Sequence, residues 1–169
     1  MEIFLENLLL ISLGGCFGSF ASMLIYRLPN PDTSTNILSP RSFCPSCRTS
    51  LSLSQLIPFF SYLANKGKCS KCNKQINGSY LLNEIFAAAL LIYLINLLGL
   101  INPMTWLIFS IAMILYVQAL MDLKTLLLSQ PLSFLLIMIG LVANIGFEIF
   151  TVPLNALLGL IFGYGLLFS

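Results

Sequence analysis

Five long apolar runs limit what this chain can fold into. Residues 3–25, 81–101, 103–121, 126–147 and 152–168 are nearly free of charged side chains. Each run is about long enough to cross a hydrocarbon core of ~30 Å as a helix. Of the 169 residues, 58% are hydrophobic and only 8% are charged, whereas soluble domains carry about 25% charged residues. The sequence therefore predicts an all-α polytopic membrane protein with about five transmembrane helices.

One segment, residues 26–80, is polar enough to face water. It holds seven of the eight basic residues and a single acid, Asp32. The basic residues are Arg27, Arg41, Arg48, Lys66, Lys68, Lys71 and Lys74. The positive-inside rule assigns such a short basic loop to the cytoplasm. The excess of positive charge suits anionic lipid headgroups at the membrane surface better than nucleic acid, so we expect a lipid bilayer and no nucleic acid as partner.

The predicted organisation follows from this topology. Transmembrane helix 1 takes residues 1–25, the cytoplasmic loop domain takes 26–80, and helices 2–5 take 81–169. Alternation of the spans then leaves Asp122 on the cytoplasmic side and Glu148 on the outer side.

Two CxxC pairs interrupt the polar loop, in "FCPSCR" at 43–48 and "CSKCNK" at 69–74. A cytoplasmic loop lies in a reducing compartment, which disfavours disulfides. The spacing therefore predicts a structural zinc site, with an iron centre and redox thiols as the alternatives. We expect the nearby basic side chains to favour thiolates. The predicted ligands are Cys44, Cys47, Cys69 and Cys72. A closed four-sulfur site has no open position for substrate, so its expected role is to fold a loop that has little apolar surface. The fifth cysteine, Cys16, is expected to be a small buried residue of the first span.

Two acidic residues adjoin the apolar runs at the predicted cytoplasmic face. Asp122 stands near the end of the third run and Glu84 about one turn into the second. Taken alone, Asp122 is explained as a charge at the end of a helix, beside Lys124. Glu84 is explained as a negative charge that stabilises the N-terminus of a helix. Ionisable residues at membrane depth are rare, however, and these two lie at similar depth beside the cysteine loop. Together they form a candidate site.

Several segments together resemble one known family, the type IV prepilin peptidases. "GSFASMLIYRLP" at 18–29 resembles the signature of its first span, and the two CxxC pairs with "IPFFSYL" between them resemble its cytoplasmic loop. "ALMDLKTLLL" around Asp122 and the Gly-rich "NALLGLIFGYGLL" are similar to later segments of the family in the same order.

The resemblance implies a bifunctional enzyme of the bacterial inner membrane. Members cleave the basic leader of type IV prepilins or pseudopilins at the cytoplasmic face, and they N-methylate the new terminus with S-adenosylmethionine. Cleavage uses two aspartates, of which Asp122 corresponds to the first. Glu84 corresponds to an acidic position in the region associated with methyl transfer, and the four loop cysteines correspond to zinc ligands.

The chain also departs from the family. The second catalytic aspartate belongs to a Gly-x-Gly-Asp motif, and the nearest string, at 163–166, has Leu166 in the place of the acid. We therefore expect a truncated member that lacks peptidase activity alone and awaits a complementing C-terminal fragment. The alternatives are a methyltransferase-only or inactive remnant, and a zinc-stabilised membrane scaffold that binds pilin leaders without chemistry. Smaller departures are Ser22, Asn73, Ser79 and the pair Ser129-Gln130, which replace the family's asparagine, glycine, arginine and Pro-Asp.

Overall fold

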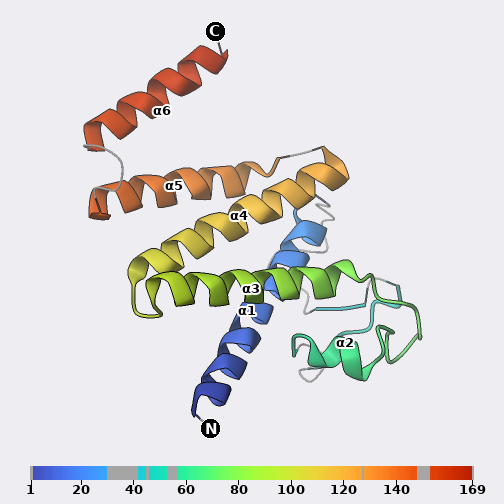
Figure 1. Ribbon diagram of the computed structural model, residues 1–169. Coiled ribbons are helices and arrows are strands. Elements are labelled where there is room, and N and C mark those ends of the chain that lie inside the picture. The colour runs from blue at the N-terminus through green and yellow to red at the C-terminus, as the bar shows by residue number, and fades with distance from the viewer. Residues whose placement is uncertain are drawn as a thin grey trace. The chain divides into compact units, whose positions relative to one another are not determined.

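The computed structural model describes residues 2–29, 42–44, 46–52, 57–126, 128–147 and 153–168. In this part of the chain five long helices and one short helix account for the regular structure, and two isolated β-bridges stand in place of a sheet (Figure 1). The helices are α1 (Glu2–Arg27), α2 (Phe60–Ala64), α3 (Ser79–Leu98), α4 (Pro103–Thr125), α5 (Gln130–Phe147) and α6 (Pro153–Phe168). The predicted all-α class is confirmed. The long helices coincide with the five apolar runs, and α1, α3 and α4 are long and apolar enough to cross a membrane.

The chain divides into two compact units, Met1–Leu127 and Leu128–Ser169. The first contains α1 to α4 and the cysteine loop. The second contains α5 and α6, which contact each other. Glu148, predicted to lie on the outer side, is outside the described residues.

A tight turn joins α3 to α4, so that the two helices run antiparallel (Figure 1). Gly99 ends α3 with φ of 92°, a conformation that costs a glycine little. The Asn102 side chain then accepts a hydrogen bond from the N–H of Met104 at 3.0 Å, and Pro103 occupies the first helical position, where its missing N–H is not needed. Thr105, fully buried, donates to the carbonyl of Gly99 at 2.7 Å. The start of α4 is therefore held by local bonds.

Two glycines of α1 let this helix approach α3 closely. A Cβ atom built on Gly14 would lie 2.4 Å from the Cα of Ala88, and one built on Gly18 would lie 2.4 Å from the carbonyl oxygen of Asn83. Small residues four apart bring helix backbones together inside membranes, where apolar burial gives little net attraction between helices. Our sequence analysis did not single out this G-x-x-x-G pair, although its spacing was visible.

A buried hydrogen-bond chain joins the three spans of the first unit. Tyr116 of α4 donates to the side-chain oxygen of Asn83 at 2.8 Å, and the amide nitrogen of Asn83 donates to the hydroxyl of Ser22 on α1 at 2.8 Å. The Tyr116 ring also stacks on Phe86, with 4.1 Å between centroids. Buried polar groups need such partners, so the chain of bonds fixes the rotation of each helix about its axis.

Apolar side chains cover the outer faces of the same helices. On α3, Leu82, Tyr93 and Leu97 are more than 60% exposed. Such a face suits lipid, since a bilayer does not require apolar residues to be buried in protein. Cys16 lies on the exposed face of α1. The prediction that it is buried was wrong, because at membrane depth a small apolar side chain can face lipid as readily as protein.

The close approach of α1 and α3 predicts that Gly18→Ala destabilises the chain. Glycine to alanine usually stabilises a helix by about 0.5–1 kcal/mol, but here the added methyl group would meet the backbone of α3 and cost about 1–3 kcal/mol. Gly140→Ala on α5 is the matched control, because nothing lies within 4 Å of its Cβ position. Thermal unfolding in detergent micelles measures both. A Gly18→Ala melting temperature equal to or above that of the unmodified chain would contradict the packing.

Candidate functional site

The first CxxC pair forms a tight turn stabilised by its own backbone. The N–H of Cys44 donates to the carbonyl of Thr49 at 3.0 Å, and the N–H of Arg48 donates back to the carbonyl of Cys44 at 2.8 Å. A bridge between Phe43 and Ser50 closes the turn. Both sulfurs of the pair therefore belong to one compact turn.

The second CxxC pair repeats this arrangement. The N–H of Cys69 donates to the carbonyl of Lys74 at 2.9 Å, and the N–H of Asn73 donates to the carbonyl of Cys69 at 2.9 Å. Asn73 has φ of 55° and its counterpart Arg48 has φ of 54°. Positive φ is the conformation that favours glycine and that asparagine tolerates well. The replacement of the family's glycine by Asn73 therefore preserves the turn.

The two turns bring four sulfur atoms together. The ligand atoms of Cys44, Cys47, Cys69 and Cys72 all lie within 4.8 Å of one another, so the group could hold a metal ion. The Sγ atoms of Cys44 and Cys72 are 3.9 Å apart, and those of Cys47 and Cys69 are 4.0 Å apart. Four sulfurs at about 2.3 Å from a tetrahedral zinc ion are separated by about 3.8 Å, so the observed spacing fits zinc.

The protonation of these thiols is uneven. Hydrogen bonds from the side chain and backbone of Thr49 lower the pKa of Cys47 from the usual 9.0 to about 6. Backbone hydrogen bonds from Cys72 and Lys71 lower the pKa of Cys69. For Cys72, a backbone hydrogen bond from Lys74 acts to lower the pKa, but desolvation and the three neighbouring sulfurs raise it to about 11. The lowered pKa values of Cys47 and Cys69 thus arise mainly from hydrogen bonds within the turns.

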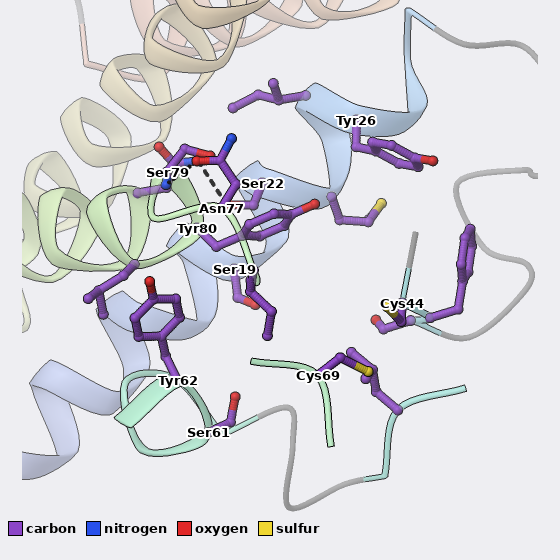
Figure 2. Close-up of a pocket in the computed structure, with 18 of the residues that line it drawn as sticks. Ser19, Ser22, Tyr26, Cys44, Ser61, Tyr62, Cys69, Asn77, Ser79 and Tyr80 are labelled. Atoms are coloured by element: carbon purple, nitrogen blue, oxygen red, sulfur yellow. Dashed lines mark hydrogen bonds between the residues drawn. The ribbon is translucent and has the colours of Figure 1, made fainter. Parts of the chain in front are cut away.

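A cavity of about 530 Å³ lies between the cysteine turns and the ends of the membrane helices. Figure 2 shows Ser19, Ser22 and Tyr26 of α1, Tyr62 of α2 and Tyr80 of α3 around it, with Cys44 and Cys69 on the loop side. Lys124 and Thr125, at the end of α4, also line it. The guanidinium of Arg27 lies 5.9 Å from the ring centroid of Phe43, which links the end of α1 to the first turn. The four-cysteine cluster and the cavity therefore share Cys44 and Cys69.

Glu84 lines this cavity and is buried. Its Oε2 accepts a hydrogen bond of 2.9 Å from the N–H of Phe59, which has φ of 61° and precedes α2. The hydroxyl of Ser19 also hydrogen-bonds this carboxylate. Glu84 therefore ties three segments together: α1, α3 and the approach to α2.

Asp122 does not line the cavity, although residues two and three positions further along α4 do. Its side chain is exposed. The buried positions of α4 follow helical spacing and include Gln118 and Met121, so Asp122 stands at the flank of that face. Glu84 thus lines the cavity that the cysteine turns also line, whereas Asp122 is exposed and does not line it.

Tyr26, Tyr62 and Tyr80 are cavity residues that our sequence analysis did not single out. Part of the signal was present, because Tyr80 and Glu84 are four residues apart and share one helix face. Tyr62 could not be found in this way, since it reaches the cavity from the short helix α2.

A comparison with known protein families gives a match over half of the chain. Residues 12–98 match the model of the Bacterial Peptidase A24 N-terminal domain. The chain belongs to this peptidase A24 family.

Curated relatives of this A24 family member carry the name prepilin leader peptidase/N-methyltransferase. One from Pectobacterium carotovorum is 32% identical over 90% of this chain and 60% of its own length. One from Pseudomonas aeruginosa is 32% identical over 94% of this chain and 61% of its own, and one from Klebsiella pneumoniae is 32% identical over 98% and 73%. The chain thus spans about 60% of the length of the first two relatives. No solved structure matches it.

The uneven thiol pKa values predict that zinc binding releases protons. Because Cys72 has a pKa of about 11, its proton must leave when a metal binds near neutral pH, so the affinity should rise about tenfold per pH unit from this thiol alone. Below about pH 6, Cys47 is protonated as well and the dependence steepens. Competition with a chromophoric chelator between pH 5.5 and 8, as an order-of-magnitude window, measures this. A pH-independent affinity, or a chain purified with iron, would contradict the assignment.

The positive φ of Asn73 and Arg48 predicts how substitutions at these positions change the affinity for zinc. Asn73→Gly should leave zinc affinity unchanged or improved, whereas Asn73→Val forces a branched side chain into left-handed backbone at a cost of about 1–2 kcal/mol, or roughly tenfold in affinity. Arg48→Gly is the matched variant of the first turn and should strengthen binding. Equal affinities for the glycine and valine variants would show that the turns do not need this conformation.

Proposed function

We propose that this chain acts on type IV prepilins or pseudopilins at the cytoplasmic face of the bacterial inner membrane, with residues 26–80 as its cytoplasmic domain. The observation that carries the proposal is the cavity, in which cysteine turns, a buried carboxylate and the ends of three membrane helices meet. A substrate whose leader is cytoplasmic and whose next segment is apolar would reach such a site from the membrane surface. The names of the relatives support the same class of substrate.

The four cysteines hold structural zinc in this proposal. The close spacing of the sulfurs, all within 4.8 Å of one another, supports it. The metal would stabilise two turns that otherwise depend on a few backbone bonds, and with four protein ligands it leaves no position for water or substrate.

Methyl transfer is the activity that these 169 residues support best. S-adenosylmethionine supplies an activated methyl group, whose C–S bond breaks as a bond to the pilin terminal nitrogen forms, releasing S-adenosylhomocysteine and a proton. Glu84 is the buried carboxylate beside which this transfer would occur. Its bonds to Ser19 and to the N–H of Phe59 hold it in a fixed orientation.

Leader cleavage needs more than Asp122. In an aspartic peptidase one carboxylate takes a proton from the attacking water while a second, protonated carboxyl polarises the scissile carbonyl. One residue cannot fill both roles at once, and the 169 residues contain no Gly-x-Gly-Asp motif. Asp122 is exposed, so its side is open to a second carboxylate from a complementing chain.

A zinc-stabilised scaffold that binds leaders without chemistry is the second candidate. The observation in its favour is that Glu84 already accepts bonds from two parts of the chain, as a purely structural carboxylate would.

The proposal predicts methyl transfer without leader removal. Purified chain in liposomes should methylate a pre-cleaved pilin peptide from labelled S-adenosylmethionine and leave an intact prepilin uncut. With a complementing polypeptide that carries Gly-x-Gly-Asp, leader removal should appear and should fall by about a thousandfold or more in Asp122→Asn, as expected when one member of a catalytic unit is lost.

Asp32→Asn is the control, because Asp32 is the chain's other aspartate. Leader removal by this chain alone would refute the need for a second aspartate. Absence of methyl incorporation together with leader binding would favour the scaffold.

A further inference from the structure

We infer that the cavity between the cysteine turns and α1 and α3 is the binding site for the methyl donor. The inference rests on the proposed function and deepens it, because nothing in the names of the relatives says where the donor binds. The cavity volume of about 530 Å³ falls within the range of roughly 300–1,000 Å³ that cofactor-sized ligands occupy.

The chemistry of the walls matches the three parts of the donor. An adenine ring requires an aromatic or apolar face, and Tyr26, Tyr62 and Tyr80 supply ring surfaces (Figure 2). A carboxylate favours a sulfonium cation, and Glu84 is the acidic side chain among the described residues of the lining. Tyr80 and Glu84 are four residues apart on α3, so a ring face and a negative charge lie side by side on one helix face.

The amino-acid end of the donor carries a carboxylate, for which the cavity lining also offers cations. Lys74 extends from the second cysteine turn and Lys124 from the end of α4, and both line the cavity. These lysines can therefore serve as charged hydrogen-bond donors to a carboxylate.

Charge argues against a pilin leader as the occupant. A basic leader needs several acidic partners, but among the described residues the lining contains four basic side chains and one acid: Arg27, Lys68, Lys74, Lys124 and Glu84. A small ligand with its own carboxylate needs only one acidic and one basic partner. The leader would then approach from the membrane surface, outside the cavity.

Calorimetric titration of the zinc-loaded chain in detergent micelles tests this assignment. S-adenosylhomocysteine is the first probe. Tyr80→Leu should weaken its binding tenfold or more, since base stacking on an aromatic ring is worth about 1–3 kcal/mol. Tyr80→Phe, which keeps the ring, should bind within about threefold of the unmodified chain, a range that corresponds to well under 1 kcal/mol. Tyr93→Leu is the matched control on α3, because Tyr93 is 63% exposed and does not line the cavity.

Glu84→Gln separates charge from structure. Because Glu84 also holds Phe59, this variant should weaken both ligands, but S-adenosylmethionine carries the sulfonium charge and S-adenosylhomocysteine does not. The ratio of the two affinities should therefore shift against S-adenosylmethionine by about fivefold or more, because a charge pair at 4 Å is worth about 1 kcal/mol even in bulk water and more when it is buried. Glu6→Gln on α1 should leave the ratio unchanged. Circular dichroism and one bound zinc per chain verify that each variant is folded.

The outcomes separate this inference from the proposed function. Equal binding by Tyr80→Leu and Tyr93→Leu, or an unchanged affinity ratio in Glu84→Gln, would place the donor elsewhere and overturn the inference while methyl transfer stands. Competition between a basic leader peptide and S-adenosylhomocysteine would assign the cavity to the leader and overturn it as well. Binding of neither probe by the unmodified chain would overturn both the inference and the proposed methyl transfer.

Discussion

The close approach of α1 to α3 through Gly14 and Gly18 sets the geometry of the first unit. In lipid, helices gain little from burying apolar surface against each other, so association depends on backbone proximity and on polar bonds between helices. Both are present, because the two glycines admit α3 and the side chains of Ser22, Asn83 and Tyr116 then bond across three helices. With α1 and α3 packed in this way, Tyr80 and Glu84 of α3 line the same cavity as Ser19 and Tyr26 of α1. If the packing of α3 against α1 shifted by one residue, the Glu84 carboxylate would rotate by about 100° around the axis of α3, away from the cavity.

The cysteine loop and the membrane helices depend on each other at this cavity. Cys44 and Cys69 belong both to the sulfur cluster and to the cavity wall. The helices in turn hold the loop, through the contact of Arg27 with Phe43 and the bond from Phe59 to Glu84. A metal that folds the turns would thereby also shape the cavity, and its four protein ligands would leave it no open coordination position.

Glu84 and Asp122 occupy the same end of the antiparallel pair α3 and α4, but they face different surroundings. Glu84 is buried and accepts hydrogen bonds from the N–H of Phe59 and from Ser19, which fix the orientation of its carboxylate. Asp122 is exposed at the flank of α4 and does not line the cavity. The two carboxylates therefore lie at one end of the helix pair but do not share one pocket.

Local patterns in the chain were enough to predict the helices and the sulfur cluster. Apolar runs of membrane-spanning length must form helices, because lipid offers no hydrogen-bond partner for unpaired backbone groups. Two CxxC pairs at this spacing predict a four-sulfur cluster once the loop folds. The family, too, could be recognised from motifs in order along the chain. The cavity could not, because it depends on how far α1 and α3 can approach and on the rotation that the Ser22–Asn83–Tyr116 bonds impose. Those contacts join residues distant in sequence, and their geometry exists only after the helices have packed.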